Sequence, residues 1–463
     1  MAELNKKQNE LLNSMSHEEL IDIIHDLIRN NKQAKSTLVN GYLLAPDDLL
    51  KKIEKEYNKR AKNTYFHDYY EADVFFDDLR INVANLFEKT VPILPEKSEA
   101  LIVKIMLDMN RLSETKDTSS GVWMEYYDTL TDAWIKSLSQ QKSSGARNIA
   151  KKIINVYDQE HFFSMDIFNQ YKSLLGVEVL RSLRDIFDEN KEEREVIYLS
   201  TIIKDLDYLE QAINKVQYPH PRYYLDYANL LIEEIKSDKA IEVLKSIDPK
   251  LIKHLSDFIK WKKLLIQALT EEGRKKEAIH ECIESFKFSP NAHFYRAYIE
   301  IEGESTGDVN LFVEIAQKRG VEYYISFLSE ISRFDLIENY IVNASSDALA
   351  HLVEIFRGPT IRSLSSELYK QGYALPAVLL RRCLTENSIN LSQSKYYSYA
   401  VSDLKKSIDY SIDVKNNTIL SDTQTYLSFL YEKHKRKTAL WPLMIEKIKG
   451  ISIGPEGICY ERG

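Results

Sequence analysis

The stretch WKKLLIQALTEEGRKKEAIHECIESFKFSP, residues 261–290, decides the expected fold. Apolar or small side chains recur in it at helical spacing, and they are Trp261, Leu264, Leu265, Ala268, Ala278 and Ile279. The polar turn Glu272-Gly273-Arg274 separates the two halves, and Pro290 ends the second. Two amphipathic helices joined by a short polar turn predict neighbouring helices that pack on each other.

The spacing within this helix pair resembles a tetratricopeptide unit, whose second helix carries a small residue twelve positions before a closing proline, as Ala278 precedes Pro290. The preceding segment looks like a shortened copy, with nine positions between Ala240 and Pro249. We therefore expect degenerate repeats. Because one such unit cannot bury its apolar face alone, the units stack, and the expected fold is an all-α solenoid of antiparallel helix pairs.

Composition supports helices throughout the chain. The 463 residues include only 14 Gly and 11 Pro, although these residues mark most turns and strand ends. Hydrophobic residues make up 44%, enough for a continuous core, and charged residues make up 29%. No segment shows a convincing strand pattern, so we expect no β-structure.

Breaks in the pattern divide the chain into four expected parts. They are an N-terminal helical-repeat region (1–217), tetratricopeptide-like repeats (218–371), a C-terminal helical cap (372–450) and a tail (451–463). The segment Ser182 to Val216 contains almost no breaker, and Tyr218-Pro219-His220-Pro221 stops it.

The N-terminal region begins with a clear helix signal. Ser16 and Glu19 form a capping box ahead of apolar residues at helical spacing, which predicts an amphipathic helix over about 16–30. Pro46 opens a second helix, and Tyr65 to Lys89 is expected to form a third with an acidic face.

The expected compartment is the cytoplasm. The first twenty residues contain no apolar core of a signal peptide, and no apolar run is long enough to span a membrane. Cys282, Cys383 and Cys459 are far apart and odd in number, which excludes a CxxC zinc site and gives no support for a disulfide framework.

The segment Lys433-His434-Lys435-Arg436-Lys437 is the candidate binding site, and it has two interpretations. Its cations could neutralise phosphates of a nucleic acid or hold an acidic segment of a partner. Alternatively, they offset the negative end of a helix dipole and bond its last carbonyls. Residues 360–463 carry 15 Lys+Arg and 10 Asp+Glu, whereas residues 1–359 carry 47 and 60, so only this end is basic.

The helices around this segment are expected to form a compact cap. Tyr397, Ala400, Val401, Leu404 and Ile408 share one face of a helix within Ser392 to Asp413, and Tyr426, Phe429 and Leu430 share a face of the next. Trp441 follows at once and is expected to anchor the last helix in the core.

The cap also contains a recognisable series of residues, Tyr399-Ala400, Leu404, Tyr426-Leu427, His434, Arg436-Lys437 and Trp441. This series resembles the C-terminal pattern of a bacterial family of unknown function, and it is similar to the helical region that closes many SWIM zinc-finger proteins. Comparable residues lie upstream at Asp68 to Ala72, Phe75-Phe76 and Asp117 to Gly121. The SWIM finger itself is absent, so the resemblance implies a helical solenoid without zinc and without an established activity.

Two other groups of residues, an acidic group near the start of the chain and the tyrosine pairs, have structural roles that explain them without a binding site. His67, Glu71, Asp73, Asp77 and Asp78 could bind a metal ion, but their two i, i+4 pairs lie apart around a helix, and a solvated acidic face fits better. Tyrosine pairs such as Tyr69-Tyr70 could place one ring in the core and one in a groove, although helix packing also explains them. No phosphate-binding, zinc-protease or serine-hydrolase motif occurs, so we expect no enzyme and no cofactor.

These observations lead to two expected functions. The first is a non-catalytic helical-repeat scaffold or adaptor that binds a protein partner. The second is a nucleic-acid-associated accessory protein that uses Lys433 to Lys437, in a process such as bacterial defence.

Overall fold

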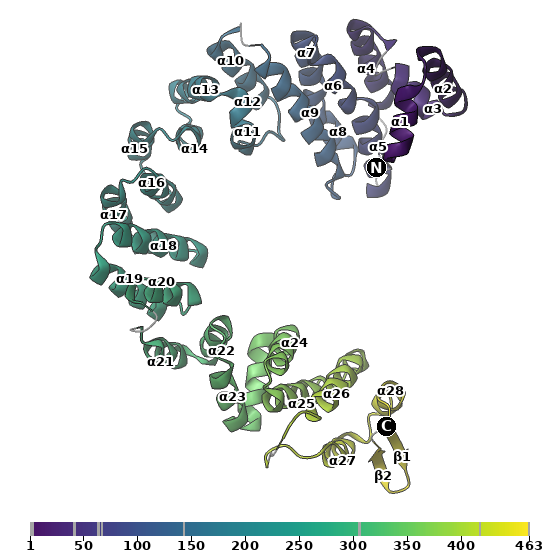
Figure 1. Ribbon diagram of the computed structural model, residues 1–463. Helices are drawn as coiled ribbons and strands as arrows, with labels where there is room; N and C mark the ends of the chain where they lie inside the picture. The colour runs from purple at the N-terminus through teal and green to yellow at the C-terminus, as the bar shows by residue number, and fades with distance from the viewer. Residues whose placement is uncertain are drawn as a thin grey trace. The chain divides into compact units, whose positions relative to one another are not determined.

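The computed structural model describes residues 4–39, 43–62, 65, 68–141, 144–303, 307–415 and 418–461. In this part of the chain almost all regular structure is helical, as expected (Figure 1). The contacts divide the chain into two compact units, Met1–Glu234 and Ile235–Gly463. The four-part division expected from the sequence stays a prediction.

The first unit runs from α1 to α16. Its elements are α1 (Lys6–Ser14), α2 (His17–Asn30), α3 (Lys32–Leu38), α4 (Pro46–Arg60), α5 (Tyr69–Asn82), η2 (Ala84–Leu86), α6 (Phe87–Thr90), α7 (Pro95–Leu107), α8 (Met109–Thr115), α9 (Val122–Ser139), α10 (Ala146–Tyr157), α11 (Asp166–Gln170), α12 (Lys172–Leu175), α13 (Val177–Asn190), α14 (Glu193–Ile203), α15 (Leu206–Lys215) and α16 (Pro221–Glu233). The predicted capping box is confirmed, because the Ser16 hydroxyl accepts from Glu19 N and the Glu19 carboxylate accepts from Ser16 N.

The second unit runs from α17 to a small hairpin. Its elements are α17 (Ser237–Ser246), η4 (Pro249–Leu251), α18 (Leu255–Glu271), α19 (Lys275–Phe288), α20 (Ala292–Glu302), α21 (Val309–Arg319), α22 (Val321–Glu330), α23 (Phe334–Asn343), α24 (Ser346–Lys370), α25 (Ala374–Asn390), η5 (Ser394–Tyr396), α26 (Tyr397–Ser411), α27 (Thr423–His434), α28 (Leu440–Lys447), β1 (Ile451–Gly454) and β2 (Gly457–Tyr460).

One type of turn joins five of the helix pairs. At each of them the chain takes up a left-handed conformation at one residue, and the next helix begins two residues later; these residues are Lys191, Lys204, Gly273, Ser332 and Gly372. At the first, Glu192 N donates to Phe187 O, and at the third Arg274 N donates to Leu269 O; the other three repeat this bond. It is the bond of a Schellman motif, which satisfies carbonyls at a helix end. The two helices joined by each turn contact each other.

Two of these turns lie in Ser182 to Val216, the segment with almost no breaker residue. The segment is divided into α13, α14 and α15, because Lys191 and Lys204 end helices in the left-handed conformation that glycine usually supplies. Lysine gives no breaker signal in a sequence.

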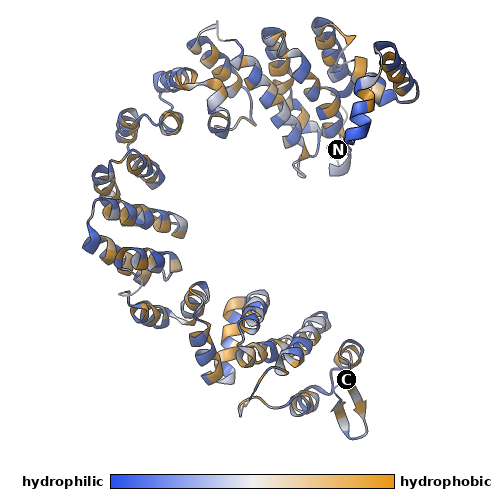
Figure 2. Ribbon diagram, viewed as in Figure 1, coloured by the Kyte–Doolittle hydropathy of each residue, from blue (hydrophilic) through white to orange (hydrophobic). Residues whose placement is uncertain are grey.

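Apolar faces of the helices form the cores, and Figure 2 shows hydrophobic and hydrophilic residues alternating along most helices. Within residues 261–290, the buried residues include Trp261, Leu264, Leu265 and Ala268 of α18 and Ala278 of α19. The last helices form a separate cluster that includes Tyr397, Leu404, Leu430, Trp441 and Met444, so the predicted role of Trp441 in the core is confirmed.

Two expectations for the C-terminal end are wrong. Phe429 is exposed, because the buried face of α27 is centred on Tyr426, Leu427 and Leu430. The tail is a two-stranded antiparallel hairpin in which Ile451 pairs with Tyr460. The two strands meet at Gly454 and Gly457, which flank the turn Pro455-Glu456, and Ile451 and Ile458 join the core of the cap.

Candidate functional site

Three of the four cations in the predicted basic segment contact side chains that lie close to it in the structure. Lys433 Nζ lies 3.6 Å from the Glu386 carboxylate and 5.2 Å from the centre of the Phe429 ring. Farther along, Lys435 Nζ lies 3.0 Å from the Glu432 carboxylate.

The end of the segment continues this pattern. Lys437 Nζ donates to Ser392 Oγ at 2.8 Å, which ties the segment to the end of α25. Arg436 is exposed. Two of the four cations, Lys433 and Lys437, thus contact α25 or the residues just after it, whereas Lys435 pairs with Glu432 three residues earlier.

His434, the centre of the predicted site, is buried. Its ring nitrogen Nε2 has no hydrogen-bond partner, and its backbone carbonyl accepts a 3.1 Å hydrogen bond from Trp441 Nε1. Burial lowers the pKa of the imidazole, and the charges of Lys433 and Lys437 lower it further. A neutral ring enclosed in the cap is a packing group and is not available to phosphate.

Beside the cap lies an ionic cluster that the sequence analysis missed. The Asp403 carboxylate on α26 is fully buried and accepts from Arg362 Nη2 and Arg381 Nη1, each at 2.7 Å. Arg381 also donates to the hydroxyls of Ser365 and Ser366 at 3.1 and 2.8 Å. These bonds join α24, α25 and α26. A charged residue at position 403, on the apolar face of its helix, was the signal that could have revealed it.

Three of the carboxylates considered for a metal site, Asp73, Asp77 and Asp78, bond to other side chains, and Glu71 is exposed. His67 lies outside the described residues, Asp77 Oδ1 pairs with Arg80 at 2.5 Å, and Asp78 pairs with Arg60. Within the described ranges, no group of three or more His, Cys, Asp or Glu side chains could hold a metal ion.

The helix that carries these carboxylates has apolar residues on two opposite sides. Ala72, Phe76 and Leu79 are buried on the inner side of α5. On the outer side, Tyr70 is 65% exposed and Val74 is 72% exposed.

Ile81, 45% exposed, extends this outer side along the helix. Positions 70, 74 and 81 fall within about 40° of one another around a helix of 3.6 residues per turn, so they form one stripe. We call Tyr70, Val74 and Ile81 the α5 stripe. A helix with large apolar residues on two sides normally buries both, whereas these three residues stay exposed in the part of the chain that the structure describes.

The rim of the α5 stripe is acidic. Asp68 and Glu71 are exposed at the start of the helix, and Asp77, half-buried, lies between Val74 and Ile81. The charge on Asp77 is offset by Arg80, which lies 3.8 Å from Glu125 of α9 as well. The stripe thus offers apolar contact area bordered by negative charge.

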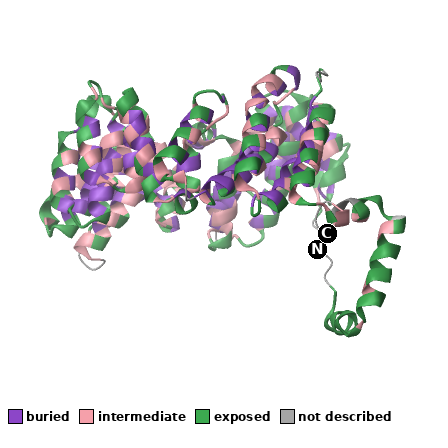
Figure 3. Ribbon diagram, turned by 90° about the horizontal axis from the view of Figure 1, so that it is seen from above, coloured by how far each residue is buried: buried purple, intermediate pink, exposed green. Residues whose placement is uncertain are grey.

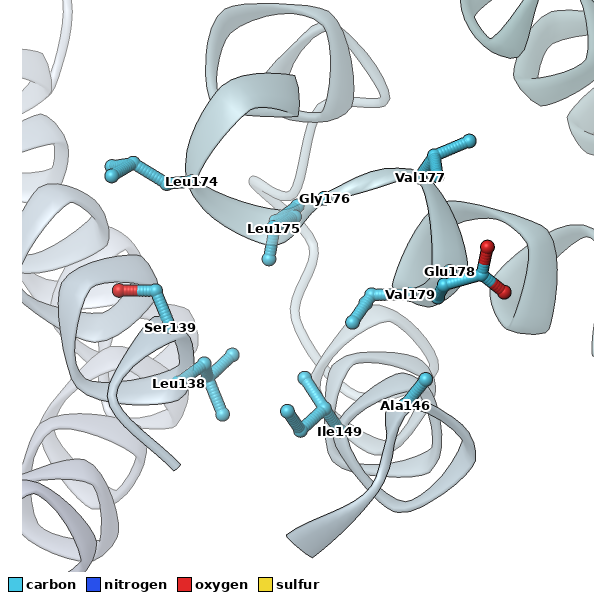
Figure 4. Close-up of a pocket in the computed structure, with 10 residues that line it drawn as sticks. All are labelled: Leu138, Ser139, Ala146, Ile149, Leu174, Leu175, Gly176, Val177, Glu178 and Val179. Atoms are coloured by element: carbon cyan, nitrogen blue, oxygen red, sulfur yellow. The ribbon is translucent and has the colours of Figure 1, made fainter. Parts of the chain in front are cut away.

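A cavity of about 310 Å³ lies among α9, α10, α12 and α13 (Figure 4). Leu138, Ile149, Leu175 and Val179 line it, and the one charged lining residue, Glu178, pairs with Arg181 at 3.0 Å. The one hydroxyl in the lining, that of Ser139, donates to Lys136 O at 2.8 Å, so most of the cavity surface is apolar.

Among the described residues, no helix combines the length and apolar character that a membrane span requires.

The tyrosine pairs do not consistently place one ring in the core and the other outside it. Tyr126 and Tyr127 are both buried, whereas Tyr69 and Tyr70 are both exposed.

Residues 195–443 match the model of a family described as a family of unknown function, DUF6880. The match covers more than half of the chain. It includes four of the five turns, those at Lys204, Gly273, Ser332 and Gly372, together with the Asp403 cluster and Trp441. No curated protein matches the chain significantly.

Proposed function

The chain belongs to the DUF6880 family of unknown function, and from that premise we propose that it is a non-catalytic helical-repeat scaffold that binds a protein partner. Its helices form, in this proposal, a solenoid of antiparallel, tetratricopeptide-like pairs. The five Schellman turns support it, because a repeated connection between contacting helices is what a repeat architecture requires.

The α5 stripe is the observation that carries the proposed binding activity. Val74, 72% exposed, stands between Tyr70 and Ile81 on a helix whose opposite side is already buried. Exposed apolar groups at helical spacing with a polar rim are typical of an interaction surface. Tyrosine adds contact area with a polar tip, which favours it at interfaces.

The charge around the stripe indicates the chemistry of the partner. Asp68 and Glu71 are exposed at one end of it, so the segment that fits best is apolar with flanking Lys or Arg. The proposed scaffold works in the cytoplasm, and the presence of three free cysteines is consistent with a reducing compartment.

Capture of partners from a lysate of the native host tests this function. We expect the full chain to retain a specific protein at mild salt and the variant Val74→Asp to lose it, because a carboxylate in the stripe would have to be desolvated. The control is Ile235→Asp, at a residue that is 91% exposed and lies outside the stripe. Equal capture by both variants would refute the role of the stripe.

The competing function, nucleic-acid binding through Lys433 to Lys437, has less support. Neutralising several phosphates requires several free cations, and Lys433, Lys435 and Lys437 each bond to a neighbouring side chain. Binding of DNA or RNA that weakens steeply with salt and is lost when the four cations are replaced by Glu would revive it.

A further inference from the structure

A second uncovered surface lies at the N-terminal end of the chain, in residues 4–39, which we call the N-terminal arm. None of its described side chains is buried, and neither is any described side chain up to position 48. Figure 3 draws α1, α2 and α3 almost entirely as exposed or intermediate. This is unusual for helices with clear amphipathic patterns, because such helices owe most of their stability to the burial of an apolar face.

The apolar face of the arm is built mainly by α2. Its large aliphatic residues all lie on one side of the helix, and they are Leu20, Ile21, Ile23, Ile24, Leu27 and Ile28. Together with Ala34 and Leu38 of α3, residues Ile24, Leu27 and Ile28 line a groove of about 460 Å³. A groove of this kind receives the apolar face of an amphipathic helix.

The charges of the arm indicate the source of the amphipathic helix that the groove receives. Residues 4–39 contain five Lys or Arg and five Asp or Glu, so the arm is neutral although the whole chain carries a net charge of −8. Two arms can therefore approach without the net repulsion that the rest of the chain would impose.

The charges are also unevenly distributed between the helices. Glu18, Glu19, Asp22 and Asp26 make α2 acidic, whereas α3 carries Lys32 and Lys35 and no acid. A two-fold interface repeats every contact, so an arrangement that places α3 of one copy against α2 of the other forms the basic-to-acidic contact twice. Lys35 lies one turn from Leu38 at the edge of the groove, and Glu19 borders Ile23 on α2.

From this groove and this charge pattern, we propose that the N-terminal arm is a self-association surface, and that its occupant is the arm of a second copy of this chain. The α2 helix of each copy lies in the α2–α3 groove of the other. The inference is independent of the proposed function, which uses the α5 stripe.

Sedimentation equilibrium of the full chain tests this proposal. The wild type is expected to have twice the monomer mass of 54.0 kDa at about 100 µM, a concentration at which a dimer with a Kd of about 10 µM is mostly assembled. The double variant Ile24→Asp/Leu27→Asp is expected to raise that Kd about 100-fold or more, because two carboxylates would enter the apolar groove. It should still fold, since neither side chain is buried within the chain.

Two further variants separate this proposal from others. Lys32→Glu/Lys35→Glu is expected to raise the Kd about tenfold, because it reverses the sign of α3 opposite α2. Val74→Asp is expected to leave the mass unchanged, because it lies on the α5 stripe. A monomeric mass for the wild type at about 100 µM, or a dimer that survives Ile24→Asp/Leu27→Asp, overturns the proposal.

Discussion

Asp403 Oδ1 and Arg381 Nη1 lie 2.7 Å apart in the interior of the second unit, where the carboxylate has no exposure to solvent. Arg362 binds the same carboxylate from α24 through two of its nitrogens. One buried negative charge therefore holds two guanidinium groups from different helices, and α24, α25 and α26 meet at this point.

Replacing Asp403 by Asn is expected to destabilise the second unit strongly. The substitution leaves Arg381 buried without a counter-charge, and breaking a buried ion pair from one side costs about 3–5 kcal/mol. Urea denaturation followed by circular dichroism measures the effect. The exposed Asp409, on the same helix, is the control, and Asp409→Asn should change the free energy of unfolding by no more than about 0.5 kcal/mol. Similar values for the two variants would contradict the structural role of the cluster.

Ile235→Gly is expected to stabilise the protein. Ile235 has φ of 57° and is 91% exposed, so its β-branched side chain strains the backbone and contributes little packing. Glycine takes up this conformation freely, and the gain should be about 1 kcal/mol in the free energy of unfolding. Ile235→Val, which keeps the branch at Cβ, should leave stability unchanged. A loss of stability in the glycine variant would show that the side chain makes a contact that its exposure does not reveal.

Helical periodicity was enough to place most helices, but it could not identify every helix end. The helix expected over about 16–30 spans His17–Asn30 in the structure. In contrast, Lys191 and Lys204 end helices in a conformation that lysine rarely adopts, so nothing in the residue type marked the turns. A Schellman turn depends on backbone hydrogen bonds, which periodicity does not report.

The sequence also revealed one part of the candidate site and missed another. The sequence located the basic segment, but it could not show that Lys433 bonds Glu386 on another helix or that His434 is enclosed. It also identified the acidic side of α5 without revealing that Val74 is uncovered. Periodicity identifies an apolar face, whereas only tertiary contacts show whether the same chain covers it.

Glu160→Gln is expected to stabilise the first unit at neutral pH. Burial raises the pKa of this carboxyl, and Oε2 has no hydrogen-bond partner, although Oε1 accepts from Phe162 N at 3.0 Å. The folded chain therefore holds the proton more tightly than the unfolded chain. Protonated Glu160 therefore contributes its full stabilisation of the fold below the ordinary pKa of 4.5. This contribution is lost as pH rises through the pKa that Glu160 has in the folded chain.

Glutamine keeps the acceptor for Phe162 N and removes the buried charge, while its Nε2 takes the unpaired position of Oε2. Because that position stays unsatisfied, the gain in the free energy of unfolding at pH 7 should be no more than about 1 kcal/mol. Thermal unfolding of both proteins between pH 4 and pH 7 provides the measurement, with the exposed Glu114→Gln as control. A gain that does not grow with pH would rule out the charge of Glu160 as its cause.

His434 makes the C-terminal cap sensitive to acid. The imidazole is buried, its Nε2 is unpaired, and burial together with Lys433 and Lys437 lowers its pKa below the ordinary value of 6.5. The unfolded chain therefore binds a proton that the folded cap excludes, and the free energy of unfolding should fall as pH drops below 6.5.

The variant His434→Phe retains a ring in the core and removes this titration, so its stability should depend less on pH between 5 and 7. His351→Phe, at a side chain that is 65% exposed, is the matched control for the exchange of an imidazole for a phenyl ring. Unfolding monitored by tryptophan fluorescence can report on the cap, since Trp441 Nε1 bonds the His434 carbonyl. An unchanged pH dependence in His434→Phe would mean that a different group controls the acid response of the cap.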